Sequence, residues 1–192
     1  MPVKYLVTYA SKYGHAKTYA RWIAEALHCE IVPARAVKGD VLRQYDVIIH
    51  GGGLYAGGLS GIDVFTRHEQ ELAGKALILF SCGLADPQDA ENVAHIEAEI
   101  AKVLLPELQQ RVKQFHLRGG IDYKKLGPVH KAMMAMLYRS VRKKDYDSLR
   151  REDQMMLDTY GGQVDFLDQS TIGPLVDYVK HLADTDGAGQ DI

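Results

Sequence analysis

Short, nearly continuous apolar runs alternate along the chain with stretches in which apolar side chains recur every three or four residues. The runs predict buried strands, and the three-to-four spacing predicts helices with one buried side. This alternation is typical of a parallel sheet with helices on both faces. The expected strands are 3–9, 30–34, 45–50, 76–81 and 112–117, and the expected helices are 16–27, 62–72, 87–104 and 174–182.

The second strand indicates how the sheet is ordered. Its Pro33 cannot donate a ladder hydrogen bond, so this strand should lie at an edge. The fifth strand is less apolar than the third and fourth, as a second edge strand would be. We therefore expect a doubly wound five-stranded parallel sheet in the order 2-1-3-4-5. A ligand crevice is then expected where the winding reverses, after Tyr9, His50 and Ser81.

The chain departs from a minimal five-strand plan after the fifth strand. We expect one domain over 1–183, with an insertion at about 123–162 and a flexible tail at 184–192. The insertion contains a predicted helix at 128–141 with Val129, Met133, Met136, Leu137 and Val141 along one side, and its other positions and its end are basic.

Composition narrows the class of protein. The 192 residues carry a formal net charge of -2, which gives no signal for a nucleic-acid partner. No apolar run approaches the roughly 18 residues of a membrane span. The first expected strand starts at Val3, which leaves no room for a signal peptide. Cys29 and Cys82 form no CxxC pair, so we expect reduced thiols and a cytoplasmic protein.

The turn after the first strand has the features of an anion site. Ser11 offers a hydroxyl, Gly14 lets the backbone approach a ligand, and Lys12 and Lys17 add positive charge. The N-terminus of the following helix favours a negative group. The alternative is an ordinary strand-to-helix turn in which Ser11 only caps the helix.

Three other phosphate motifs fit poorly. A Walker loop requires glycines before the Lys-Ser/Thr pair, but Lys17-Thr18 follows Ala16. Residues 51–56 match G-x-G-x-x-[GA], yet further glycines follow and no helix opens there. A phospho-receiver domain needs acidic residues after the first strand, and residues 9–11 contain none.

The turn at 11–16 resembles the flavodoxin phosphate loop, [ST]-x-[ST]-G-x-T, although Tyr13 and Ala16 replace hydroxyl residues. This resemblance implies non-covalent FMN, with its phosphate in the turn and its ring between the loops after strands three and four. The FMN-binding residues that it implies are Ser11, Lys12, Tyr13, Gly14, His15 and Ala16, then Gly52, Gly53, Leu54, Tyr55 and Gly57, and finally Ser81, Cys82, Gly83 and Leu84.

Two residues of these loops have alternative roles. Tyr55 either lies against the flavin ring or is an exposed loop tyrosine. Cys82 is either an inert buried thiol, the more common case, or a redox partner. No histidine pair has the spacing of a metal site.

The insertion gives a finer resemblance. A basic, Met- and Leu-rich helix after strand five is similar to that of the menaquinone-dependent protoporphyrinogen oxidases. That resemblance implies electron transfer through FMN to a quinone or a redox partner protein. Three functions remain open for the chain: an electron carrier that uses FMN, a protoporphyrinogen oxidase-like enzyme, or a non-redox binding module on the same fold. For residues 128–144 the alternatives are peripheral membrane contact or packing on the sheet.

Overall fold

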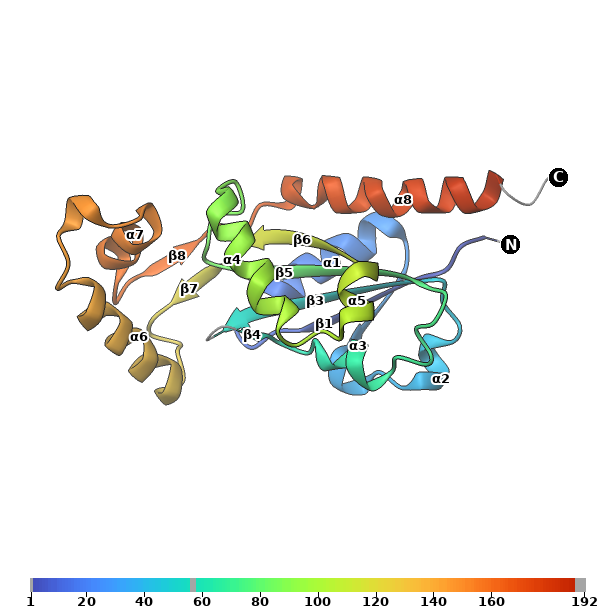
Figure 1. The fold of residues 1–192 in the computed structure, drawn as a ribbon, viewed down its shortest axis with the longest axis horizontal. Helices are drawn as coiled ribbons and strands as arrows, with labels where there is room; N and C mark the ends of the chain where they lie inside the picture. The colour runs from blue at the N-terminus through green and yellow to red at the C-terminus, as the bar shows by residue number, and fades with distance from the viewer. Residues whose placement is uncertain (1, 56–57, 189–192) are drawn as a thin grey trace.

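The computed structural model describes residues 2–55 and 58–188, which contain a central six-stranded sheet (Figure 1). The strand order is β2-β1-β3-β5-β6, with all four neighbouring pairs parallel, so the expected doubly wound order is confirmed. A short sixth strand, β4 (Gly58–Leu59), pairs antiparallel with the end of β3. The parallel strands are β1 (Tyr5–Ala10), β2 (Glu30–Pro33), β3 (Val47–Tyr55), β5 (Ala76–Gly83) and β6 (Val112–Arg118).

Helices cover both faces of the sheet because the inner strands are apolar on both sides. Alternate residues such as Val7 and Ile49 pack against one helical layer, and Leu6 and Ile48 pack against the other. The first layer is α1 (His15–Leu27) and α8 (Gly173–Ala188); the second is α2 (Gly39–Leu42), α3 (Asp63–Arg67), α4 (Ala90–Ala101) and α5 (Pro106–Arg111). Short 3-10 turns lie at Ala34–Ala36, Tyr146–Ser148 and Gln169–Ile172.

α1 forms as its sequence pattern predicts. Its six periodic apolar positions, from Ala16 to Leu27, are all buried. The helix begins after Gly14, whose left-handed φ of 102° strongly favours glycine, and ends at His28, which adopts φ 51°. α1 is therefore fixed at both ends and along one side.

The glycine run after His50 was expected to be a loop, and this prediction was wrong. β3 continues through it to Tyr55, because Gly51 pairs with both Tyr9 and Phe80 in the neighbouring strands. The Phe80 ring fills the space where a side chain at position 51 would stand. β5 likewise continues past Ser81 to Gly83.

Two helix predictions also differ from the structure. α4 begins at Ala90, where the Asp89 carboxylate accepts a hydrogen bond from the Glu91 N–H, rather than at Pro87 after Asp86. The Asp86 carboxylate accepts a hydrogen bond from the Gln88 N–H in the turn before α4 and also pairs with Arg118. The helix expected over 62–72 shortens to α3, and turns follow it up to Gly74, which has φ 73°.

The segment after β6 forms a lobe at the opposite end of the molecule from the chain termini (Figure 1). It consists of the antiparallel ribbon β7 (Gly120–Asp122) and β8 (Gln163–Asp165), with α6 (Pro128–Val141) and α7 (Arg151–Thr159) between the two strands. α6 packs against α7 and the ribbon rather than against a face of the sheet.

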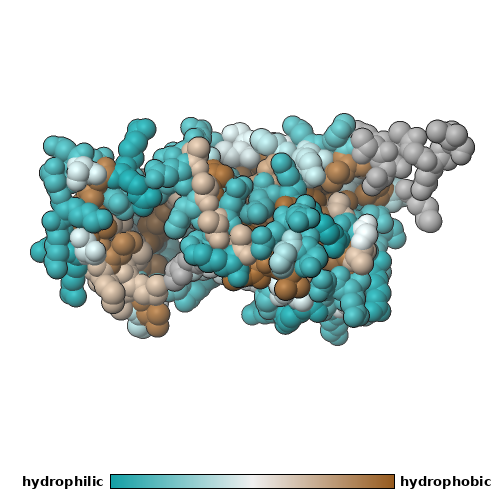
Figure 2. Space-filling view, viewed as in Figure 1, coloured by the Kyte–Doolittle hydropathy of each residue, from teal (hydrophilic) through white to brown (hydrophobic). Residues whose placement is uncertain are grey.

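Most of the predicted apolar side of α6 faces outward, although Val141 is buried. Val129 and Met136 are 67% and 70% exposed, while Met134, Tyr138 and Val141 face the interior of the lobe. The Tyr138 ring is stacked on Tyr160, 4.0 Å between centroids. Figure 2 shows apolar surface along α6 within a hydrophilic rim.

At the end of the chain, α8 continues to Ala188, so residues 184–188 of the predicted tail are helical, and 189–192 lie outside the described residues. Across the described chain, no helix combines the length and the apolar character needed to span a membrane.

Candidate cofactor site

Three segments that are distant in the sequence meet at the carboxyl ends of β1, β3 and β5 and enclose a cavity of about 140 Å³. The lobe after β6 closes its fourth side. Nine of the fifteen predicted residues line this cavity: Tyr13, His15 and Ala16, Gly53, Leu54 and Tyr55, and Cys82, Gly83 and Leu84.

Five predicted residues do not line it, and Gly57 lies outside the described residues. Ser11 and Gly14 shape the turn, since the Gly14 N–H donates to Ser11 Oγ at 3.1 Å. The Lys12 N–H donates to Tyr55 Oη at 3.4 Å. Gly52 packs against the Ser60 carbonyl and the Leu59 side chain, and Ser81 is buried with its hydroxyl 2.8 Å from His116 Nδ1.

The turn before α1 has donors available for an anion. Among the described residues, none accepts a hydrogen bond from the backbone N–H of His15, Ala16 or Lys17, whereas Thr18 N–H donates to the Gly14 carbonyl at 2.9 Å. These three groups lie at the positive end of a 13-residue helix. The arrangement can therefore bind a phosphate through the backbone.

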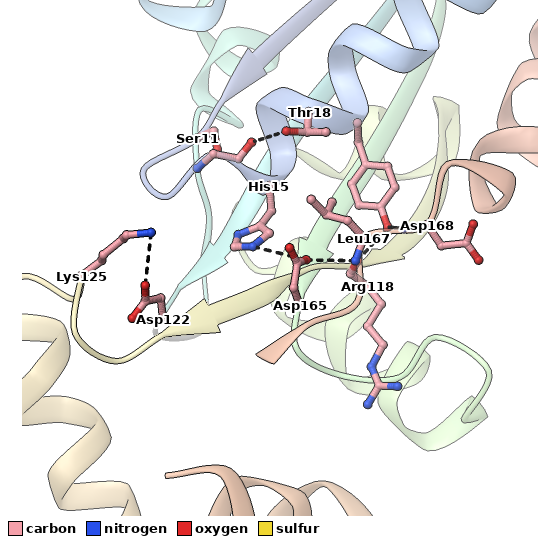
Figure 3. Close-up of polar contacts among 11 residues, drawn as sticks. Ser11, His15, Thr18, Arg118, Asp122, Lys125, Asp165, Leu167 and Asp168 are labelled. Atoms are coloured by element: carbon pink, nitrogen blue, oxygen red, sulfur yellow. Dashed lines mark hydrogen bonds and ion pairs between the residues drawn. The ribbon is translucent and has the colours of Figure 1, made fainter. Parts of the chain in front are cut away.

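His15 lies between this turn and the lobe. Its Nε2 is 3.7 Å from Asp165 Oδ1 on β8, and Figure 3 shows the two side chains pointing toward each other. In the same view, Lys125 and Asp122 pair in the loop that leads to α6, at 3.2 Å. The turn before α1 and the added ribbon are thus in direct contact.

An aromatic cluster forms the outer wall of the cavity. The Tyr55 ring is stacked on the His130 ring, with 5.3 Å between centroids and 25° between planes. Tyr13 packs edge-on against Tyr55 at 5.7 Å and its hydroxyl lies 2.7 Å from His130 Nδ1. Burial raises the pKa of the Tyr55 hydroxyl above its usual value of 10.0. Tyr55 is therefore part of the cavity wall.

The residues that the lobe contributes to the cavity were not predicted from the sequence. The Gly119-Gly120 pair, directly after a strand at the carboxyl edge, was an available signal. A Cβ at position 119 would lie 2.8 Å from Cys82 Sγ, and one at 120 would lie 2.5 Å from the Val164 carbonyl oxygen. The others, which carried no comparable signal, are Ile121, Leu126, His130, Met133 and Met134.

Cys82 is 5% exposed, and burial raises the pKa of its thiol to about 12. A thiol that stays protonated is a poor nucleophile. In a Cys29→Ser variant we expect the native protein to react with a thiol reagent at pH 8 at least tenfold more slowly than the same protein in denaturant. Equal rates in the two states would show that Cys82 is accessible.

The described residues fit FMN better than a metal ion. Backbone N–H groups without an acceptor among the described residues lie at the turn before α1, Leu54, Tyr55 and Leu84 provide apolar walls, and glycines line the cavity between them. No group of His, Cys, Asp and Glu in the described part of the chain could hold a metal ion.

Comparison with known families decides the assignment. A family model described as a flavodoxin domain matches residues 6–148. The chain belongs to the flavodoxin domain family. This flavodoxin domain binds FMN and transfers electrons to redox partner proteins, so the expected cofactor and class of function are confirmed.

Solved structures with similar folds include flavodoxins. An archaeal flavodoxin is 17% identical and has a TM-score of 0.39, with coverage of 61% of this chain and 85% of its own. Flavodoxin 2 from Bacillus cereus is 22% identical with a TM-score of 0.38, covering 60% and 86%. The two-electron reduced flavodoxin of Megasphaera elsdenii is 19% identical with a TM-score of 0.41, covering 58% and 82%.

These identities and TM-scores are low, so the family assignment rests on the family model. A search of curated proteins found no match. The comparisons give no support to the finer resemblance to menaquinone-dependent protoporphyrinogen oxidases.

Proposed function

We propose that this flavodoxin domain holds the FMN phosphate in the turn at 11–16 and the flavin ring in the cavity beside Tyr55. The observation that carries this proposal is the set of backbone N–H groups at His15, Ala16 and Lys17, which open toward the cavity end of the sheet without an acceptor among the described residues. Bound FMN supplies the electron-transfer chemistry.

The chain's own residues would bind the cofactor and shield it. The N-terminus of α1 offsets the phosphate charge, and Lys12 and Lys17 add positive charge near the turn. Leu54, Tyr55 and Leu84 exclude water from the ring site and fix its orientation. Cys82 remains a neutral thiol because its pKa is raised to about 12.

The direct test is titration of cofactor-free protein with FMN, in which binding is monitored through the quenching of flavin fluorescence. We expect saturable one-to-one binding with a micromolar or lower dissociation constant. A Gly14→Ala variant should bind more weakly, because φ 102° is strained for a residue with a Cβ. Absence of wild-type binding at micromolar FMN would exclude the proposed site.

Replacing Ala16 with serine should strengthen FMN binding. Ala16 lines the cavity beside the donor groups and stands where the family motif has a hydroxyl. A hydrogen bond to a charged acceptor contributes about 1.5–3 kcal/mol, so we expect at least a tenfold lower dissociation constant for Ala16→Ser. The matched control, Ala20→Ser, lies one turn further along the same buried side of α1 and should not improve binding. Equal affinities for Ala16→Ser and the wild type would contradict the expected phosphate position.

A second candidate is an enzyme that passes electrons to a quinone, as in protoporphyrinogen oxidation. The apolar wall that Ile121, Leu126, Met133 and Met134 add to the cavity supports it, because the apolar ring of a quinone could pack against such a wall. Menaquinone-dependent oxidation of protoporphyrinogen by the FMN-loaded protein should then be measurable. If a flavodoxin reductase reduced the protein but no quinone turnover were found, only the electron-carrier function would remain.

We also propose that α6 touches an anionic membrane surface. Val129, Met133, Met136 and Leu137, which we call the α6 ridge, are 39–70% exposed, and Arg139 and Arg142–Lys144 lie beside the ridge or at its end. Vesicles with anionic lipid should carry the protein in flotation at low salt, and a Val129→Ser/Met136→Ser variant should bind much less. Equal flotation of both proteins, or none, would contradict this contact.

A further inference from the structure

His130 joins α6 to the turn that we assign to the FMN phosphate. The Tyr13 hydroxyl accepts a hydrogen bond from the Gly127 N–H at 3.3 Å, so it can donate its own proton to His130 Nδ1 at 2.7 Å. The imidazole is then the Nε2–H tautomer. Its ring is also stacked on Tyr55, so one side chain of α6 contacts both the phosphate turn and the ring wall.

The rest of the lobe reinforces this contact. Tyr13 and Leu84, from two walls of the cavity, pack in one apolar cluster with Ile121 and Leu126 of the lobe. On the other side of Gly14, His15 lies 3.7 Å from Asp165 of β8 (Figure 3). The lobe therefore contacts the residues on both sides of the glycine that shapes the turn.

The closed arrangement leaves little room. The cavity of about 140 Å³ is smaller than the roughly 300–1,000 Å³ of small-molecule sites. His130, Met133 and Met134 of α6 form its outer side. The opposite side of α6 carries Val129 and Met136 of the α6 ridge, which are 67% and 70% exposed and belong to no packed cluster of the described chain. A helix attached along one side opens at a lower free-energy cost than an element buried on all sides.

We propose that α6 is a latch over the cofactor cavity, closed by the Tyr13–His130 hydrogen bond, which must open each time FMN enters or leaves. His130 is a positioning residue in this device: it holds the helix against the turn and the ring wall. The inference rests on the proposed FMN site, and it adds that the lobe controls the rate at which FMN exchanges.

Because FMN must pass the latch both to enter and to leave, the latch affects the rates of FMN association and of FMN dissociation. Both the association and the dissociation rate are proportional to the fraction of time that the latch is open. His130→Phe keeps a ring that can stack on Tyr55 but loses the acceptor for Tyr13. The loss of one such hydrogen bond should speed both rates about three- to tenfold, so the dissociation constant changes far less than either rate.

Stopped-flow quenching of FMN fluorescence measures both rates. Tyr13→Phe removes this hydrogen bond and also the acceptor of the Gly127 N–H, so it should speed both rates at least as much as His130→Phe. Adding His130→Phe to Tyr13→Phe should then change the rates little, because the hydrogen bond is already lost. Lys131→Ala, at the next, exposed position of α6, should leave both rates at the wild-type values. Faster dissociation together with unchanged or slower association would overturn the latch, since it would indicate only weaker binding.

Hydrogen exchange of the cofactor-free protein separates this inference from the FMN assignment. His130→Phe should speed amide exchange in residues 131–134 about three- to tenfold and leave α1 and β3 unchanged. If the wild-type protein bound no FMN, the proposed function would fail, while this measurement would still report the latch. Unchanged exchange in α6 would overturn the latch whether or not FMN binds.

Discussion

Replacement of Gly51 by alanine is expected to lower the free energy of unfolding by about 3 kcal/mol or more. Gly51 lies inside the sheet, paired with Tyr9 on one side and Phe80 on the other. A Cβ at this position would lie 1.8 Å from Phe80 Cζ, and the Phe80 ring is fully buried. The strands or the ring must shift, so urea unfolding should show a much lower midpoint.

Two further variants test the cause. Phe80→Leu in the Gly51→Ala background should recover part of the lost stability, because it removes the atoms that collide with the new Cβ, although Phe80→Leu alone leaves a cavity. Gly173→Ala is the matched control. A Cβ there meets nothing within 4 Å, and the helical backbone accepts alanine. If the free energy of unfolding of Gly51→Ala lay within 1 kcal/mol of the wild-type value, the sheet would not be as tightly packed here as the structure shows.

Stability should fall by up to about 3 kcal/mol between pH 6.5 and pH 4 because of His50. Its ring is fully buried, accepts a hydrogen bond from Thr8 Oγ1 at 2.9 Å and donates one to the Ser60 carbonyl at 3.0 Å. Burial lowers the pKa of His50 from 6.5 to about 4. The unfolded chain therefore binds the proton first as the pH falls, and the native state loses stability over that interval.

His50→Gln isolates this contribution. Glutamine has a donor and an acceptor but does not titrate, so the variant should lose less stability than the wild type between pH 7 and pH 4. Burial also lowers the pKa of His116, which contributes in the same direction in both proteins. Urea unfolding at a series of pH values provides the comparison. Parallel stability curves for the two proteins would show that His50 is not the responsible group.

The architecture was predictable because local chemistry and the fold agree. The apolar positions of α1 are buried as the periodicity predicts, and Pro33 lies in an edge strand because it cannot donate to a ladder. The turn at 11–16 and the ends of β3 and β5 meet at the expected edge. A family motif with two departures, at Tyr13 and Ala16, was enough to locate the cavity.

The errors arose where tertiary partners decide the structure. The glycines at 51–53 read as a loop because the Phe80 ring that requires Gly51 is distant in the sequence. Most of the predicted apolar side of α6, Val141 excepted, is exposed, because α6 packs through Tyr138 on Tyr160 of the lobe and not on the sheet. His130 was missed because its partner Tyr13 is 117 residues away.

The ribbon of β7 and β8 makes the segment between its two strands replaceable. Gly120 pairs with Asp165 and Asp122 pairs with Gln163, so the lobe leaves and rejoins the core at neighbouring points about 5 Å apart. A tight turn from Asp122 to Gln163 could therefore replace the 40 residues between them without rerouting a single strand of the parallel sheet. The segment between β7 and β8 can thus be replaced without changing the sheet, and one flavin-binding core can carry different segments over its cavity.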